Sequence, residues 1–298
     1  MKKVLATVAA VGCLAAASTA LGGLPAATGV NGSLHDMTLV VGSQADSMAR
    51  VCVFCHTPHH AQSSDGGYNL PLWNHDIPDV TTYTPYAWAT PMNSNNGEFT
   101  ITDPLAGPSR LCMSCHDGAI AVDEHNSAFG KDASQATTSI ANVTTYTNQQ
   151  GRGALGKDLT QTHPIGFDYV ELAAWRNSNS QNGALDANHN PTGDTEIVSA
   201  DKGYALSITV ENTTQGKYNY VQRNVGGKRI VDNLYGANIM TCATCHEVHN
   251  KENATQDNFT DGPKNLTVGG TTYPMAAPNY FLYAKQSESL ICLSCHVK

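Results

Sequence analysis

The sequence predicts a mostly irregular fold, with short helices, one small β-hairpin and little other regular secondary structure. Charged residues make up only 14% of the 298 residues, and 26 glycines accompany many Asn, Ser and Thr, a composition that disfavours long helices. A short motif, Cys-x-x-Cys-His, occurs four times at uneven spacing. One stretch near residue 210 alternates apolar and polar residues beside a turn, which is typical of a hairpin. We therefore expect the groups bound by the four motifs, rather than an aliphatic core, to organise the chain.

The four motifs begin at Cys52, Cys112, Cys242 and Cys292 and use eight of the nine cysteines. This motif is the attachment signature of c-type haem, in which both thiols bond to porphyrin vinyl groups and the His becomes the proximal iron ligand. Structural zinc is the alternative, but zinc does not require a His directly after each second Cys. The sequence therefore predicts four covalent c-type haems and a haem-organised multihaem cytochrome c fold. The covalent residues are Cys52, Cys55, Cys112, Cys115, Cys242, Cys245, Cys292 and Cys295, and the proximal ligands are His56, His116, His246 and His296.

The first 20 residues have the pattern of a secretory signal peptide. Lys2 and Lys3 precede a small apolar stretch at 4–17, and the residues at 18–20 form a plausible cleavage site. The apolar stretch is too short to span a bilayer comfortably. A lipoprotein site at Cys13 is a weaker alternative. We therefore expect an exported mature chain at 21–298, as haem attachment outside the cytoplasm requires, and the formal charge of −8 argues against nucleic acid as a partner.

The motifs divide the mature chain into two halves around an insertion. Their first cysteines are separated by 60, 130 and 50 residues. Motifs 1 and 3 are each followed by a further histidine, His59 and His249, whereas motifs 2 and 4 are each preceded by a serine, Ser109 and Ser289. We expect a single tetrahaem domain at 21–298, made of a haem 1 and 2 half at 21–125, an insertion with the hairpin at 126–236 and a haem 3 and 4 half at 237–298.

Local signals predict where the elements lie. Pro108 and Ser287 are typical helix starts before motifs 2 and 4, and Gly118 is a typical helix stop. The stretch 71–92 is rich in Pro, Tyr and Trp without helical period, which predicts an ordered loop that packs aromatic rings on haem. One short helix is expected at 167–176. The hairpin is expected at 206–210 and 218–222, with a turn at 211–217.

Eight of the twelve histidines remain for the sixth position of the irons, and geometry restricts them. Two axial nitrogens lie on opposite sides of one iron, about 4 Å apart if each bond is about 2 Å long. Residues three apart on one helical turn face the same way, so His59 cannot share the iron of His56, nor can His249 share that of His246. We therefore expect His59 to bind haem 2 and His249 to bind haem 4, which brings the two haems of each half into close contact.

Haems 1 and 3 then need distal ligands from elsewhere. His163 is the first choice, because Pro164 and Gly166 fix a tight non-helical backbone around an exposed imidazole. His35 is the second choice, with Asp36 as an orienting neighbour. The weaker candidates are His60, which competes with His59; His75, His125 and His189, expected in solvent or behind the ligands; and the thioethers of Met37, Met92, Met240 and Met275.

A wider set of segments accompanies these ligands. It comprises Ser-Leu-His35-Asp, motif 1 with Thr-Pro-His59, Pro71-Leu-Trp-Asn, Tyr83-Thr-Pro-Tyr86, motif 2 with Asp-Gly118, and His163-Pro-Ile-Gly-Phe-Asp. Over nearly all of the mature chain, this set resembles the filament-forming outer-surface multihaem cytochromes of metal-reducing bacteria. The resemblance implies that haems stack in alternating parallel and perpendicular pairs and that a distal His near the N-terminus serves the adjacent subunit. By location that residue is His35, which would complete haem 3 of a neighbour, while His163 would complete haem 1.

These observations predict a bis-His tetrahaem electron-transfer protein rather than an enzyme. The resemblance implies secretion to the cell surface, polymerisation into extracellular conductive filaments ("nanowires") and electron hopping along stacked haems. The implied partners are further copies of the chain, upstream periplasmic or outer-membrane cytochromes, and extracellular acceptors such as metal oxides. The alternatives are a monomeric periplasmic or outer-surface carrier, a structural fibre with haems as staples, and a multihaem reductase. A reductase needs an open iron position, whereas this chain has twice the spare histidines required.

Overall fold

The structure is a computed structural model, and the residues that it describes include all four motifs. These residues are 29–31, 35–37, 50–58, 61, 70–87, 101, 103–118, 154–179, 196–213, 216–249, 265–268, 271–274 and 281–297.

Regular secondary structure is sparse in these stretches, which confirms the prediction. The longest described helix has 11 residues, and within the described chain no helix is long and apolar enough to cross a membrane. The helices are α3 (Pro108–His116), α4 (Tyr169–Asn179), α5 (Cys242–Cys245) and α6 (Leu290–Cys295), with the 3-10 turns η2 (Val51–Phe54), η3 (Val80–Thr82), η6 (Ile230–Asn233) and η7 (Ser287–Ser289). The strands are β1 (Ala205–Thr213), β2 (Gly216–Arg223), β3 (Asn265–Val268) and β4 (Thr271–Pro274).

The predicted hairpin is confirmed, but its turn is shorter than expected. β1 and β2 pair antiparallel from Ala205 with Arg223 to Thr213 with Gly216, so the ladder includes residues that the sequence assigns to the turn at 211–217. The ladder can extend through polar residues because its bonds use backbone groups rather than side chains. β3 and β4 form a second antiparallel hairpin, which the sequence signals did not predict.

The helices beside the motifs follow the local signals closely. α3 begins at Pro108, whose fixed φ suits the first helical turn. Gly118 follows its end with a φ of +74°, a left-handed conformation that glycine adopts without steric cost. The turn η7 begins at Ser287, and α6 continues from it. The helix expected at 167–176 is present as α4, displaced by a few residues toward the C-terminus.

Fifteen buried residues form the main hydrophobic cluster, and all of them lie between 167 and 293. Contributions come from α4, the start of β1, η6 and α6. A second cluster has four members, Tyr83, Leu105, Met113 and Leu159, and packs around α3. We expected haems rather than an aliphatic core to organise the chain, and the described residues include a sizeable hydrophobic cluster in addition to the four motifs. The average composition hides it, because its apolar residues gather in the second half of the chain.

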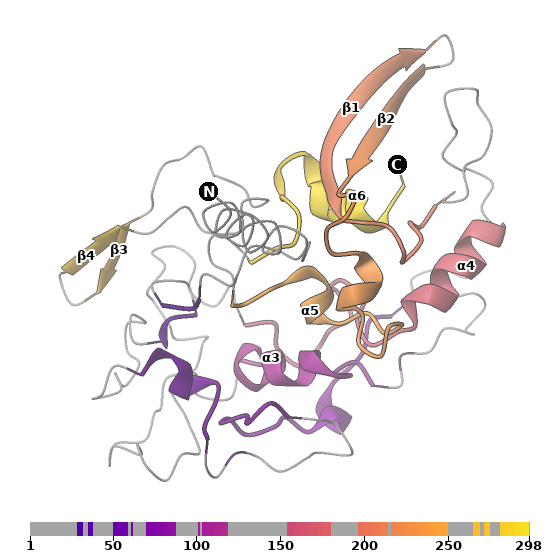
Figure 1. The fold of residues 1–298 in the computed structure, drawn as a ribbon. Helices are drawn as coiled ribbons and strands as arrows, with labels where there is room; N and C mark the ends of the chain where they lie inside the picture. Colours follow the sequence, from indigo (N-terminus) through magenta and orange to yellow (C-terminus); the bar gives the residue numbers. More distant parts are fainter. Residues whose placement is uncertain are drawn as a thin grey trace, which may run out of the picture.

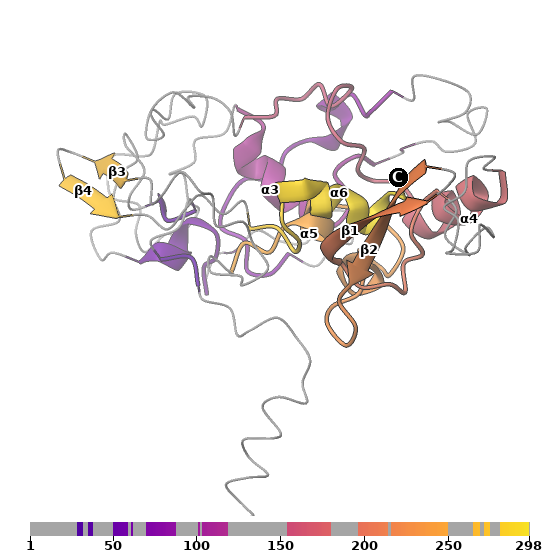
Figure 2. The same ribbon diagram turned by 90° about the horizontal axis from the view of Figure 1, so that it is seen from above.

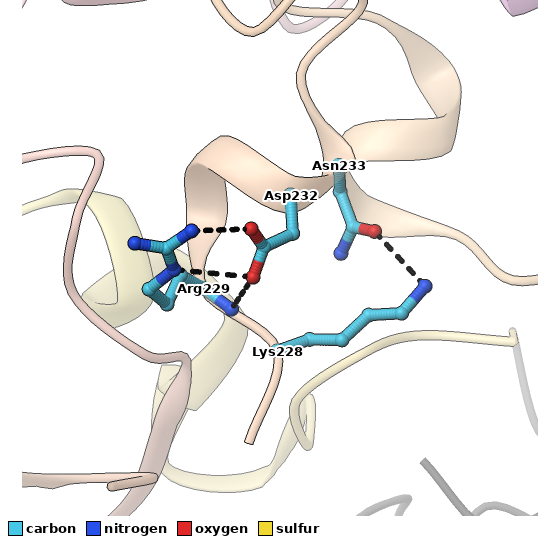
Figure 3. A network of polar contacts seen from close by, with 4 residues as sticks. All are labelled: Lys228, Arg229, Asp232 and Asn233. Carbon is cyan, nitrogen blue, oxygen red and sulfur yellow. Dashed lines mark hydrogen bonds and ion pairs between the residues drawn. The ribbon is translucent and has the colours of Figure 1, made fainter. Parts of the chain in front are cut away.

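A polar network closes the turn η6 on itself (Figure 3), and η6 lies beside α5, which carries motif 3. Arg229 pairs with the Asp232 carboxylate at 2.8 Å, and that carboxylate also accepts from the Arg229 backbone N–H at 2.9 Å. Lys228 donates to the Asn233 side chain at 3.3 Å. The Asn233 carbonyl accepts from the Thr244 hydroxyl of α5 at 3.1 Å. The turn η6 therefore holds the helix of motif 3 through the Asn233 backbone carbonyl.

The base of the β1–β2 hairpin holds α6, and the two lie side by side in Figures 1 and 2. The Ala205 N–H donates to the Ser294 hydroxyl at 2.9 Å. Arg223 donates to the carbonyls of Leu293 and Ser294, each at 2.9 Å. These carbonyls lie near the C-terminal end of α6, where a helix lacks internal donors. The hairpin thus fixes motif 4 in place, while its outer part rises from the body (Figure 1).

Candidate haem-binding sites

In motifs 1, 3 and 4, one helical turn brings both cysteines and the histidine together. Residues three and four apart on such a turn share a face, so the spacing presents two thiols and one imidazole on the same side of the backbone. This is the set of groups that c-type haem attachment needs. The turn is closed by the N–H of the motif His donating to the first Cys carbonyl: His56 to Cys52 at 2.9 Å, His246 to Cys242 at 3.1 Å and His296 to Cys292 at 2.8 Å.

A remote segment fixes the backbone of each of these three histidines. At motifs 3 and 4 the helix ends at the second Cys, and the His leaves it in an extended conformation. Each of the three then forms an isolated β-bridge. In motif 2, by contrast, α3 continues through His116. The bridges join His56 to Trp73, His246 to Leu282 and His296 to Ile197.

The segment that begins at Pro71 connects motif 1 to motif 2. The Trp73 indole lies edge-on to the His56 ring, 5.7 Å between ring centres, and its N–H donates to the Ser114 hydroxyl of α3 at 3.1 Å. The side-chain amide of the buried Asn74 donates to the Val53 carbonyl at 2.5 Å. The described part of the predicted aromatic loop at 71–92 is therefore ordered, and it braces a motif histidine from the side.

His75 is a residue whose position the sequence reasoning missed. It is only 1% exposed, and both ring nitrogens lie 3.8 Å from the Cys115 sulfur of motif 2. We expected it in solvent or behind a ligand, and its burial excludes solvent. Its place within the aromatic loop was the available signal, because that loop was already expected to pack on haem.

Three pairs of histidine rings each join one motif histidine to one histidine outside the motifs. Two imidazoles that bind one iron from opposite sides have ring centres about 6 Å apart, given metal–nitrogen bonds of about 2 Å. Rotation about those bonds is free, so the angle between the ring planes is not constrained. The observed pairs are His56 with His249 (6.1 Å, 25° between planes), His116 with His35 (5.9 Å, 80°) and His296 with His163 (6.4 Å, 73°). All three match the separation of axial ligands.

Hydrogen bonds at Nδ1 orient several of these rings. The His56 Nδ1 lies 2.6 Å from the Pro71 carbonyl, and the His163 Nδ1 lies 3.0 Å from the Pro164 carbonyl. The His249 Nδ1 lies 3.3 Å from the Glu247 carboxylate. A donor bond at Nδ1 fixes the neutral tautomer and leaves Nε2 to bind a metal. The residues present therefore fit a haem iron held by two imidazoles, in their spacing and in the nitrogen that they leave available.

The ring contacts differ from the pairing expected for the distal ligands. His249 faces His56 of motif 1 rather than the histidine of motif 4, and His163 faces His296 of motif 4 rather than the histidine of motif 1. The rule that residues three apart cannot share an iron does not say which remote motif the His249 ring meets. Which histidine binds which iron stays a prediction.

His35 lies against the His116 ring of its own chain and packs on the Phe281 ring at 4.7 Å, and its expected role between subunits stays a prediction. Desolvation, and then the nearby His116, His246 and His249, lower the pKa of His35 to about 3. Its imidazole is therefore neutral near pH 7, which is the form that binds metals. His35 lies where the sites of motifs 1, 2 and 3 meet.

The thiols of the motifs approach one another across the chain. Cys112 of motif 2 and Cys242 of motif 3 hydrogen-bond to each other, and the Cys242 N–H donates to the buried Ser109 hydroxyl at 3.1 Å. Burial raises the pKa of Cys55 and of Cys295 to about 11. These two thiols are therefore not set up as thiolate nucleophiles, unlike the cysteines of thiol-dependent enzymes.

Several predicted candidates lie outside the described residues. The Met240 side chain belongs to the main hydrophobic cluster, which accounts for its burial without iron binding. Among the described residues, no three His, Cys, Asp or Glu side chains are grouped so that they could hold one metal ion. The candidates outside the described residues are His59, His60, His125, His189, Met92 and Met275.

Comparison with known proteins adds no assignment. No family model matches the chain, and no curated protein matches it significantly.

Proposed function

We propose that this chain is a tetrahaem c-type cytochrome that transfers electrons and performs no catalysis. The observation that carries the proposal is the set of three histidine pairs, each 5.9–6.4 Å between ring centres and each containing one motif histidine. The adjacent cysteines supply the thiols for covalent attachment. A c-type haem bound at such a site exchanges single electrons at its iron.

The paired histidines support electron transfer over substrate turnover. His249, His35 and His163 would occupy the sixth positions opposite the histidines of motifs 1, 2 and 4, so that no position stays open at these three sites. A multihaem reductase needs an open position. With three distal ligands allocated, five histidines remain for His246 of motif 3. We keep His59 as the first candidate, and the weaker candidates are His60, His75, His125 and His189.

We further propose that the protein is exported and polymerises into extracellular filaments. The support is the resemblance of its segment set to filament-forming surface cytochromes and the signal pattern at 1–20. Because His35 faces His116 of its own chain, the contact between copies in this proposal does not require His35. The partners would be further copies, upstream periplasmic or outer-membrane cytochromes and extracellular acceptors such as metal oxides.

Haem content and spin state test the cofactor part of this function. Pyridine haemochrome quantitation of the purified protein should return four haems per chain, one for each motif. The oxidised protein should be entirely low-spin by absorption and electron paramagnetic resonance. A substantial high-spin signal would contradict the paired axial ligands and would favour the reductase.

Electron microscopy of the same preparation tests the filament part. Filaments built from the four-haem chain are the expected result. A preparation that contains four low-spin haems but stays monomeric in light scattering would support the monomeric carrier instead. The two measurements thus separate the cofactor chemistry from the assembly.

A further inference from the structure

The Glu247 carboxylate contacts both the backbone and the ring of His249, the proposed distal ligand of haem 1. One carboxylate oxygen accepts from the His249 backbone N–H at 3.1 Å and lies 3.3 Å from the His249 Nδ1. The other oxygen accepts from the Tyr283 hydroxyl at 3.2 Å. The Glu247 backbone N–H donates to the Phe281 carbonyl at 2.7 Å. The Glu247 backbone and carboxylate are therefore both held in place by contacts other than the one with the imidazole.

This arrangement sets His249 apart from the other oriented rings. The Nδ1 atoms of His56 and His163 meet neutral backbone carbonyls, whereas that of His249 meets a carboxylate. At the corresponding position after motif 1 the chain has Thr57 instead of an acid. The carboxylate contact at Nδ1 thus distinguishes His249 from His56 and His163.

A carboxylate bonded to Nδ1 increases the basicity of a metal-binding imidazole. A more basic ligand, with a negative charge behind it, stabilises the oxidised iron more than the reduced iron, because the oxidised iron carries one more positive charge. A neutral carbonyl bonded to Nδ1 favours the oxidised iron less.

We propose that Glu247 is a positioning residue that lowers the reduction potential of the haem held between His56 and His249. The inference rests on the proposed binding of haem by these histidines. Electrons would reside less readily at this site than they would without the carboxylate.

The test is Glu247→Gln in the full-length, haem-loaded protein. Glutamine keeps the length of the side chain and an oxygen that can accept from both His249 N–H groups, but it removes the charge. Spectroelectrochemical titration should show one of the four potentials rising by about 59 mV, which is a tenfold change in a one-electron equilibrium. The haem count should stay at four, all iron should stay low-spin, and one low-spin paramagnetic resonance signal should move.

The matched control is Glu171→Gln, an exposed acid in the first turn of α4. It removes the same charge from the molecule and should leave all four potentials unchanged. If Glu247→Gln gives the same four potentials as Glu171→Gln, the inference is wrong. A wild-type protein without four haems would instead overturn the proposed function itself.

Tyr283→Phe provides a second test, in which the reduction potential should shift in the opposite direction. It is the test to use if the Glu247→Gln protein binds fewer than four haems. Without the hydroxyl, the Glu247 carboxylate loses a competing donor and interacts more strongly with His249. One potential should therefore fall. An unchanged or raised potential would contradict the role of the carboxylate, since loosened packing alone gives no reason for a downward shift confined to one site.

Discussion

Two regions of this molecule hold their motifs by different means. Motifs 3 and 4 lie beside the fifteen-residue hydrophobic cluster, and Arg223 and the η6 network fix their helices from outside. Motif 1 lies in a 3-10 turn, and backbone bonds to the segment at 71–75 and one histidine pair hold it. The first region contributes to this fifteen-residue cluster, whereas motif 1 buries Val53 and Phe54 outside both described clusters. We infer that motif 1 depends on its haem for local order far more than motif 4 does.

Removing the thiols of motif 1 should give the largest effect. The double variant Cys52→Ser, Cys55→Ser should lower the haem content from four to three. It should also abolish hydrogen-exchange protection of the Asn74 backbone N–H, which donates to the Cys55 carbonyl. The matched variant, Cys292→Ser with Cys295→Ser, should lose one haem but keep protection at Val198, because the core remains. Equal loss of protection in both variants would remove the distinction between the regions.

Replacing His35 tests whether the ring pairs are formed within one chain. His35→Ala should convert one haem of four to a five-coordinate, high-spin state in monomers as well as in any filaments, because the partner His116 belongs to the same molecule. Absorption and paramagnetic resonance of size-selected monomers measure this. If isolated wild-type monomers already contain one high-spin haem and His35→Ala adds none, the ligand acts between subunits instead.

Core truncation should cost most in the region of motifs 3 and 4. Ile230 is fully buried in the fifteen-residue cluster, and Ile230→Ala should lower the free energy of unfolding by about 2–5 kcal/mol. Leu105→Ala in the four-residue cluster should fall at the lower end of that range, because fewer neighbours define the cavity. Urea denaturation measures both, with Val225→Ala, a 96% exposed site, as the control. A larger loss for Leu105→Ala would reverse the ranking.

The smallest effect concerns the exposed ion pair of η6. The Arg229 guanidinium and backbone N–H lower the pKa of Asp232. Its carboxylate therefore contributes stability that is full above the unfolded pKa of about 3.9 and is lost as the pH falls through the lower folded value. Asp232→Asn should cost about 0.5–1 kcal/mol at pH 7, given the solvent exposure of the pair, and nothing once the wild-type carboxyl is protonated. Urea titrations at pH 7 and pH 2.5 measure the difference, and a cost that persists at the lower pH would argue for a role other than charge.

Local chemistry made much of this protein predictable from its sequence. The Cys-x-x-Cys-His spacing fixes two thiols and an imidazole on one turn, and Pro108, Gly118 and the alternation in β1 act within a few residues of themselves. These signals gave the motif geometry, the ends of α3, the hairpin and the scarcity of regular structure. They need no knowledge of distant segments, which is why they agreed with the structure.

Tertiary structure alone decided which histidine faces which motif. His249 meets His56 across nearly 200 residues of chain, and His163 meets His296 across more than 130. No local pattern encodes such an approach, because it depends on how the core and the bridging segments place the backbones. The burial of His75, the contact of Glu247 with His249 and that of Tyr283 with Glu247 follow from the same packing. The sequence by itself determined which groups are available for the proposed attachment and ligation of haem. The fold determined which of these groups meet, because their meeting depends on distances between segments that the order of residues does not specify.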